Sequence, residues 1–143
     1  MRLSRRNFSS CSATIPDVDL LLDTHAFIWW DMENPRLDEG ARAAIANAEN
    51  RVFVSAASVW EISIKRTVGK LTFRDNILRA VMRNGFETMS IAPQHADAAG
   101  GLPLHHADPF DRMLVAQAIM EGFVLVTQDR QLLPYGVPVL GMR

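Results

Sequence analysis

The 143-residue sequence predicts an α/β fold, namely a three-layer α/β/α sandwich around a central, mainly parallel sheet of four or five strands. Short apolar runs alternate along the chain with segments of helical periodicity, and Pro or Gly marks many of the boundaries. Strands that alternate with helices imply right-handed crossovers, which produce a parallel sheet covered by helices. Because 48% of the residues are hydrophobic, the chain can bury one core, and we expect a single domain over residues 20–143.

The first half of the chain alternates apolar runs with helical repeats. The expected elements are, in order, a strand at 20–22, a helix over 24–32, a helix over 38–47, a strand at 52–54 and a helix over 55–66. The strands are short apolar runs, whereas the helices repeat apolar residues every three or four positions. Asn34-Pro35 and Gly69 end the first and third helices, because Pro and Gly disrupt helical backbone.

The second half continues the same alternation. The expected elements are, in order, an amphipathic helix that includes 77–82, a weaker strand at 87–91, a short helix from Pro93 closed by Gly100-Gly101, a longer helix from Pro109 to about Glu121, and strands at 123–127 and 137–140. Pro fits the first turn of a helix, where its missing N–H has no partner to lose. Gly122 is the expected C-terminal stop of the longer helix.

Composition limits the functions that need to be considered. The net charge of −1 predicts no general attraction to nucleic acid, so binding there would need a local basic patch. One such stretch exists, although a solvated helix face is the simpler interpretation; it comprises Lys65, Arg66, Lys70, Arg74, Arg79 and Arg83. The single cysteine, Cys11, cannot form an internal disulfide, which fits a cytoplasmic location. No apolar run approaches the roughly 18 to 20 residues that span a membrane.

Residues 1–19 differ from the rest of the chain. They contain three arginines and four serines, carry no acid before Asp17, and lack hydrophobic periodicity. We expect a flexible N-terminal extension. A transit peptide is the alternative, since the segment is basic and rich in serine but lacks the apolar centre of a secretory signal.

Two apolar strands end on an aspartate. Asp23 follows the strand at 20–22, and Asp129 follows the strand at 123–127. Ligands bind at the carboxyl ends of strands in open α/β sheets, so the fold can bring both acids to one edge. Two further acids, Glu61 and Asp111, stand at the openings of expected helices. Four carboxylates in one cleft would suit Mg²⁺ or Mn²⁺, which prefer oxygen ligands.

Each acid also has a purely structural interpretation as a helix cap. Asp23 and Asp129 precede helical segments, and Ser58 with Glu61 fits the capping-box pattern. Asp108 can likewise cap the helix from Pro109, with Asp111 placed to favour the helix dipole. Taken together, the acids indicate more than capping. Asp111 shares a helix face with apolar residues at spacings of three, four and seven, and several carboxylates buried together are costly without a cation.

Other polar residues near the acids are weaker candidates. The pair His105-His106 could bind a softer transition metal together with Asp108, although adjacent side chains reach one ion only from a bent loop. His25 is expected to cap or pack. Arg112 and Arg130 could meet a phosphate or form surface ion pairs. Two threonines beside the acids, Thr24 and Thr127, could orient a carboxylate, and we expect the tryptophans Trp29, Trp30 and Trp60 to make core or dimer contacts.

Four motifs together resemble one known family. They are Leu21-Leu22-Asp23-Thr24-His25, Ser55-Ala56-Ala57-Ser58-Val59-Trp60-Glu61-Ile62, Asp108-Pro109-Phe110-Asp111-Arg112 followed by Ala116-Gln117-Ala118, and Leu125-Val126-Thr127-Gln128-Asp129. In this order they resemble the PIN-domain family, and within it the VapC-type toxins of bacterial toxin-antitoxin modules. The resemblance covers nearly everything after Asp19.

The resemblance implies a metal-dependent ribonuclease. Its acidic residues correspond here to Asp23, Glu61, Asp111 and Asp129, with Asp108 as an additional candidate for the metal. It also implies a homodimer, an RNA substrate and a small antitoxin protein that blocks the site. Both Mg²⁺ and Mn²⁺ remain candidates for the metal.

The leading hypothesis is therefore a divalent-metal-dependent endoribonuclease that acts as the toxin of a toxin-antitoxin pair. One alternative is a non-catalytic protein-binding module whose acids only cap helices. Another is a metal-dependent phosphohydrolase of small phosphate esters. The phosphohydrolase is disfavoured because Asp23-Thr24-His25 has no second aspartate two positions on, as an aspartyl-phosphate mechanism would need. No glycine-rich phosphate loop is present either.

Overall fold

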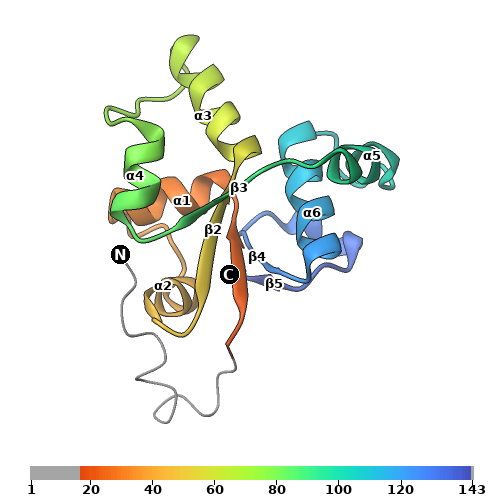
Figure 1. Ribbon diagram of the computed structural model, residues 1–143, viewed down its shortest axis with the longest axis horizontal. Coiled ribbons are helices and arrows are strands. Elements are labelled where there is room, and N and C mark those ends of the chain that lie inside the picture. The colour runs from red at the N-terminus through yellow and green to blue at the C-terminus, as the bar shows by residue number, and fades with distance from the viewer. Residues whose placement is uncertain (1–16, 143) are drawn as a thin grey trace.

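A computed structural model describes residues 17–142 of the chain (Figure 1). The elements are, in order, β1 (Asp19–Leu22), α1 (Thr24–Asp31), α2 (Glu39–Ala46), β2 (Arg51–Ser55), α3 (Ala56–Thr67), α4 (Ile77–Arg83), β3 (Glu87–Met89), α5 (Pro93–Gly101), α6 (Pro109–Glu121), β4 (Val124–Val126), the 3₁₀ helix η2 (Arg130–Tyr135) and β5 (Val139–Leu140). The expected extension at 1–19 lies outside the described residues except for 17–19, and β1 already begins at Asp19.

The described strands form one parallel sheet of five, in the order β3-β2-β1-β4-β5. The prediction of a mainly parallel sheet of four or five strands is confirmed. The central strand β1 pairs with β2 on one side and β4 on the other, so Leu22 lies opposite both Val54 and Val126. The backbone N–H of Asp23 continues this pairing by donating to the Val126 carbonyl at 3.0 Å. The segments that follow β1 and β4 therefore leave the sheet side by side.

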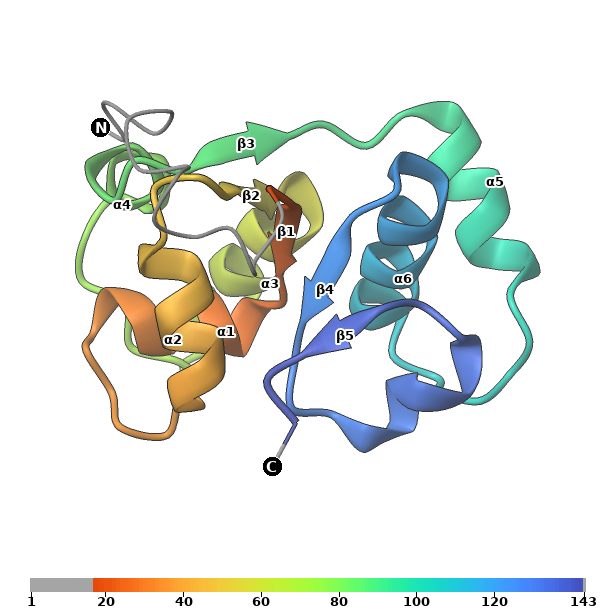
Figure 2. The ribbon, with the colours of Figure 1, turned by 90° about the horizontal axis from the view of Figure 1, so that it is seen from below.

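Each face of the sheet builds its own core, because successive strand residues point to opposite faces. Leu20 and Leu22 pack with α1, α2 and α4, whereas Leu21 packs with α6. Figure 2 shows α1, α2 and α4 on one side of the sheet and α5 and α6 on the other. All three leucines are fully buried, and each contributes roughly 2 kcal/mol through removal of apolar surface from water. The three-layer architecture is confirmed.

The start of α3 corrects one expectation from the sequence. The helix expected over 55–66 is present, but the capping box of Ser58 and Glu61, the structural alternative for Glu61, is not, because α3 begins at Ala56 and its cap is Ser55. The Ser55 hydroxyl accepts a hydrogen bond from the Ala57 N–H at 3.0 Å. Strand β2 passes directly into α3 without a loop, so the helix starts earlier than the capping-box pattern predicted. Glu61 consequently lies in the second turn, where it has no capping role.

Other boundaries shifted less. Gly100 and Gly101 lie inside α5 instead of following it, and β3 and β5 are shorter than the apolar runs that predicted them. Helix α6 spans Pro109–Glu121 as expected, with Gly122 in the left-handed conformation at its end. Among residues 17–142 no helix combines the length and apolar character needed to cross a membrane.

Candidate metal centre at the carboxyl edge of the sheet

Asp23 is a buried carboxylate at the end of the central strand. It caps α1 by accepting a hydrogen bond from the Ala26 N–H at 2.7 Å, and the residue is only 7% exposed. This burial raises the pKa of Asp23 to about 6 against the lowering effect of hydrogen bonds from Thr127 and Ala26, and the charges of Glu61 and Asp129 raise it further. Asp23 is therefore both a helix cap and a member of a group of acids whose negative charges disfavour its ionisation.

Asp111 lies in the first turn of α6, beside the cap of that helix. Asp108 caps α6 by accepting hydrogen bonds from the N–H groups of Phe110 at 2.8 Å and Asp111 at 3.2 Å. Burial raises the pKa of Asp111 to about 6, and so do the charges of Asp108, Asp23 and Glu61, whereas a hydrogen bond with His106 lowers it. The Asp111 side chain is 21% exposed, so it can still be reached from solvent.

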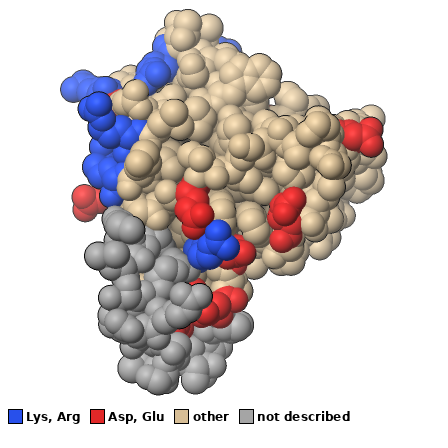
Figure 3. All heavy atoms as spheres, viewed as in Figure 1, with Lys and Arg blue, Asp and Glu red and all other residues tan. Residues whose placement is uncertain are grey.

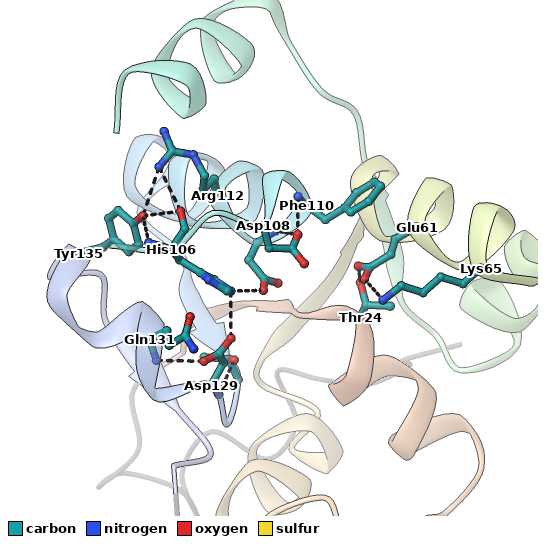
Figure 4. Close-up of polar contacts among 12 residues, drawn as sticks. Thr24, Glu61, Lys65, His106, Asp108, Phe110, Arg112, Asp129, Gln131 and Tyr135 are labelled. Carbon is teal, nitrogen blue, oxygen red and sulfur yellow. Dashed lines mark hydrogen bonds and ion pairs between the residues drawn. The ribbon is translucent and has the colours of Figure 1, made fainter. Parts of the chain in front are cut away.

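His106 joins two of the acids directly. Its Nε2 lies 2.9 Å from Oδ2 of Asp111 and 3.2 Å from Oδ2 of Asp129, as Figure 4 shows for the ring between α6 and the segment after β4. Ligand atoms of these three residues all lie within 4.8 Å of one another, a spacing that could hold a metal ion. Sequence reasoning had paired His105-His106 with Asp108, but the structure brings His106 to Asp111 and Asp129.

His105 points elsewhere, although it is the immediate neighbour of His106. It is exposed, and its ring packs edge-on against Tyr135 with centroids 5.0 Å apart. The two histidines precede α6 in an irregular segment without a hydrophobic period. For that reason the sequence could predict that a histidine lies near Asp108 but not which acids it would meet.

Glu61 has its own set of partners on the opposite side of the site. The Thr24 hydroxyl donates to Glu61 Oε1 at 2.6 Å, and Lys65 Nζ donates to Oε2 at 2.6 Å (Figure 4). The Glu61 side chain is 5% exposed, so both of its oxygens are satisfied in a buried position. Hydrogen bonding to Glu61 raises the pKa of Lys65, and the nearby charges of Asp108 and Asp111 raise it further. Glu61 therefore has a positive partner within its own helix, four residues further along.

Arg112 does not lie where either of our expectations put it. It is buried, and its guanidinium donates to the backbone carbonyls of Ala99 at 2.9 Å, Leu102 at 3.0 Å and Pro103 at 3.0 Å. The expectations of a phosphate contact or a surface ion pair are both wrong. Five donors on one planar group satisfy several carbonyls at once, so Arg112 holds together the segment between α5 and α6 that carries His106.

The aromatic residues also divide differently from the expectation. Trp29 and Trp30 are partly buried and pack against the core on the α1 side. Trp60 is 60% exposed and is not a core residue, so for Trp60 only the expected dimer contact stays a prediction. Its ring meets Phe110 edge-on, with centroids 5.3 Å apart, next to the two acids Glu61 and Asp111. His25 is exposed and packs against Trp29, in agreement with the packing interpretation.

The basic stretch is partly structural. On the face seen in Figure 3, Lys and Arg side chains gather along the edge occupied by α4 in Figure 1. Arg83 pairs with Asp31 at 2.7 Å and also with Asp75, and Arg66 donates to the carbonyls of Phe73 and Asp75. These contacts join α4 to its neighbours, so they account for part of the stretch without any nucleic acid.

The donor set at the carboxyl edge fits a divalent cation. Carboxylate oxygens of Asp111 and Asp129 and an imidazole nitrogen of His106 lie within 4.8 Å of one another. Asp23 is outside that group, but its charge acts on Asp111 and is acted on by Asp129. Two of these carboxylates have a pKa raised to about 6, because burial and like charges disfavour ionisation of both. A cation would offset that repulsion, whereas ordinary helix caps would not require one.

The fold is an open parallel α/β sheet, a class in which ligands bind outside the carboxyl ends of the strands, and here acids lie at the ends of two central strands. The family model described as PIN domain matches residues 20–136. The chain belongs to the PIN-domain family, which confirms the resemblance found in its motifs.

Individual relatives agree with this assignment. The chain is 34% identical over 121 residues to Ribonuclease VapC22 of Mycobacterium tuberculosis (strain ATCC 25618 / H37Rv). The aligned region covers 79% of this chain and 88% of the relative. It is similar in fold to a structure of DNA-bound VapBC from Salmonella typhimurium, with a TM-score of 0.62, 18% identity and coverage of 86% and 97% of the two chains. It is also similar in fold to VapBC2 from Rickettsia felis bound to a promoter DNA fragment, with a TM-score of 0.61 and 15% identity. That match covers 85% of this chain and 96% of the other.

Proposed function

We propose that this protein is a divalent-metal-dependent endoribonuclease and the toxin of a toxin-antitoxin pair. The observation that carries the proposal is the group of acids at the carboxyl edge, in which Asp23 and Asp111 are buried among like charges. Kinship with Ribonuclease VapC22 supports RNA as the substrate class. Residues 20–143 would form the nuclease domain, and residues 1–19 would be an extension to it.

The acids would divide into two groups by role. Asp23, Asp111 and Asp129 would bind Mg²⁺ or Mn²⁺ directly, with Asp108 close enough to act on Asp111 through its charge. Glu61 would act through water or through its neighbours, because Thr24 and Lys65 already engage both of its oxygens. The bound ion would lower the pKa of a water molecule and stabilise the leaving oxygen of the phosphodiester. Lys65 would balance the charge of Glu61 and keep it from competing for the ion.

The partners follow from the same assignment. We propose RNA as the substrate, a cognate antitoxin protein as the inhibitor and a homodimer as the assembly. A structure with a similar fold, from Klebsiella pneumoniae, is described as a toxin-antitoxin complex, which supports the antitoxin. A cytoplasmic location, expected from the single cysteine, stays a prediction. The exposed side chains of Lys70, Arg74 and Arg79 would supply the local attraction to RNA that a net charge of −1 does not.

The test is RNA cleavage by the purified protein with Mg²⁺, with Mn²⁺ or with chelator. Asp23→Asn and Asp111→Asn should each lower the rate to below roughly one hundredth of the wild-type value, because a ligand carboxylate positions the charge that stabilises the transition state. Asp38→Asn is the matched control. Asp38 caps α2 by accepting from the Ala41 N–H at 3.0 Å, so this change alters a capping aspartate outside the site.

The outcomes separate the hypotheses. Cleavage that persists with chelator, or in the Asp23→Asn/Asp111→Asn double variant, would exclude this mechanism. A folded protein that cleaves no RNA under any metal condition would favour the protein-binding module. Hydrolysis of a generic phosphate ester without RNA cleavage would favour the phosphohydrolase.

A further inference from the structure

We propose that His106 is a nitrogen ligand of the metal, alongside Asp111 and Asp129, and that it biases the site toward Mn²⁺ and similar transition ions over Mg²⁺. The inference rests on the proposed function in one respect, which is that a divalent ion binds at this edge of the sheet. It adds a residue that the four-carboxylate interpretation of the motifs does not contain.

The spacing around His106 matches the edge of a coordination octahedron. Nε2 lies 2.9 Å and 3.2 Å from the carboxylate oxygens of Asp111 and Asp129. Ligands about 2.1 Å from a metal and at right angles to each other are about 3.0 Å apart. Both distances from Nε2 therefore match those between neighbouring ligands of one ion, and all three ligand atoms lie within 4.8 Å of one another. Both contacts are made by Nε2, so this ring nitrogen is the His106 atom that faces the two acids.

Hydrogen bonds with Tyr135 and Arg112 fix the backbone of His106. Its backbone N–H donates to the Tyr135 hydroxyl at 3.0 Å, and its carbonyl accepts from Arg112 Nη1 at 3.3 Å. Tyr135 in turn donates to the Pro103 carbonyl at 2.8 Å. Figure 4 shows Arg112 and Tyr135 on the side of His106 away from the carboxylates. These contacts fix the backbone position from which the imidazole ring projects, and a metal site needs its ligands on such a fixed support.

A nitrogen ligand changes which ions the site prefers. Mg²⁺ favours oxygen ligands in a near-ideal octahedron, whereas imidazole nitrogen suits transition ions, whose affinities rise from Mn²⁺ through Co²⁺ to Ni²⁺. Exchange of one oxygen for nitrogen should therefore help Mn²⁺ more than Mg²⁺. Glu61 is poorly placed to compensate, because Lys65 and Thr24 engage its two oxygens.

The direct test is pulsed electron paramagnetic resonance of Mn²⁺ added to the metal-free protein. Wild type should show the coupling of one imidazole nitrogen, and His106→Gln should abolish it. Calorimetric titration should show that His106→Gln lowers Mn²⁺ affinity by roughly tenfold or more while Mg²⁺ affinity changes much less. His105→Gln is the matched control, since it changes the adjacent, exposed histidine and should leave both the coupling and the affinities as they are.

Two results would overturn the inference. The first is Mn²⁺ binding that depends on Asp111 but shows no nitrogen coupling in wild type. The second is a ratio of Mn²⁺ to Mg²⁺ affinity that is the same in wild type and His106→Gln. In both cases the proposed nuclease would stand, because metal binding would remain. A protein that binds neither ion would instead remove both proposals. The wild-type spectrum decides the question even if His106→Gln folds poorly.

Discussion

Asp23 combines two roles that oppose each other energetically. As the cap of α1 it accepts a hydrogen bond from Ala26, an interaction that typically stabilises a helix by about 1 kcal/mol. As a carboxylate buried beside Glu61 and Asp129 it is costly to ionise, and its pKa is raised to about 6. Below the ordinary pKa of 3.8 both folded and unfolded states are protonated, so the cost is absent there. It develops as the pH rises to 6 and is complete above that.

Asp23→Asn should therefore stabilise the metal-free protein at pH 8. The amide keeps a cap oxygen but carries no charge, so we expect a gain of about 2 kcal/mol at pH 8 and almost none at pH 4. Urea unfolding with chelator at several pH values measures this difference. Asp38→Asn, at the cap of α2, should give no such gain. Loss of stability at pH 8 would mean that the cap, and not charge repulsion, dominates at Asp23.

At the scale of elements, the segment between α5 and α6 shows how an irregular stretch is given a fixed shape. Residues 102–108 form no regular structure, yet the guanidinium of Arg112 reaches from α6 to carbonyls at the end of α5 and in this segment. Because the donors sit on one rigid plane, the carbonyls they bind are held in one arrangement. Helix α6 thus positions both Asp111, in its first turn, and His106, before its cap.

Arg112→Met should loosen this segment. Loss of several hydrogen bonds from a buried cation should lower the free energy of unfolding by about 3 kcal/mol. Hydrogen exchange should become faster over residues 99–108, and Mn²⁺ should bind more weakly because His106 is no longer held. Urea unfolding and exchange mass spectrometry make these measurements.

The control for this prediction is Arg79→Met on the exposed face of α4, which should change stability by less than about 0.5 kcal/mol. Equal effects of the two substitutions would indicate that the carbonyl contacts of Arg112 contribute little. Unchanged exchange over residues 99–108 would lead to the same conclusion.

At the scale of the whole molecule, the site exists only when the sheet is complete. Asp23 follows β1, Asp129 follows β4, Glu61 lies in α3, and Asp111 lies in α6. The acids are brought together by parallel pairing of the central strands and by α3 and α6, which pack against each other. A ligand of this site should therefore bind the folded chain and not the unfolded chain.

Divalent metal should accordingly stabilise the whole fold. At a metal concentration one hundred times the dissociation constant, the free energy of unfolding should rise by about 2.7 kcal/mol. The gain should be smaller at pH 5 than at pH 8, because protons on Asp23 and Asp111, whose pKa values are raised to about 6, compete with the ion. Thermal and urea unfolding at matched ionic strength test both statements. Equal gains at the two pH values, or in Asp111→Asn, would contradict them.

Local patterns in the sequence predicted most of the fold. Leu20–Leu22 and Val124–Val126 read as strands because they are apolar and short, and α6 was bounded correctly by Pro109 and Gly122. The exception at α3 is instructive. The helix expected over 55–66 is present as α3, but the capping box at Ser58 is not, because β2 passes without a loop into a helix that Ser55 caps.

The site was predicted only in part. Asp23 and Asp129 could be placed together because strands of a parallel sheet end at the same edge. His106 and Arg112 could not be placed, since their partners are decided by an irregular segment whose path depends on carbonyl contacts with α6. Helical spacing also could not decide between a core and a dimer contact for Trp60, because it does not tell which face of α3 meets the sheet.

The sequence by itself determined the class of fold, the caps of α1 and α6, and which acids of the PIN-like motifs are candidates for the site, because these depend on residue types at short separations. Only the tertiary structure decided how those acids divide. In the folded chain Glu61 is hydrogen-bonded to Lys65 and Thr24. Asp23 and Asp111 are buried and have raised pKa values, and the ring of His106 faces Asp111 and Asp129. The physical reason is that charge balance in a buried site depends on distances across the fold, which no local pattern specifies.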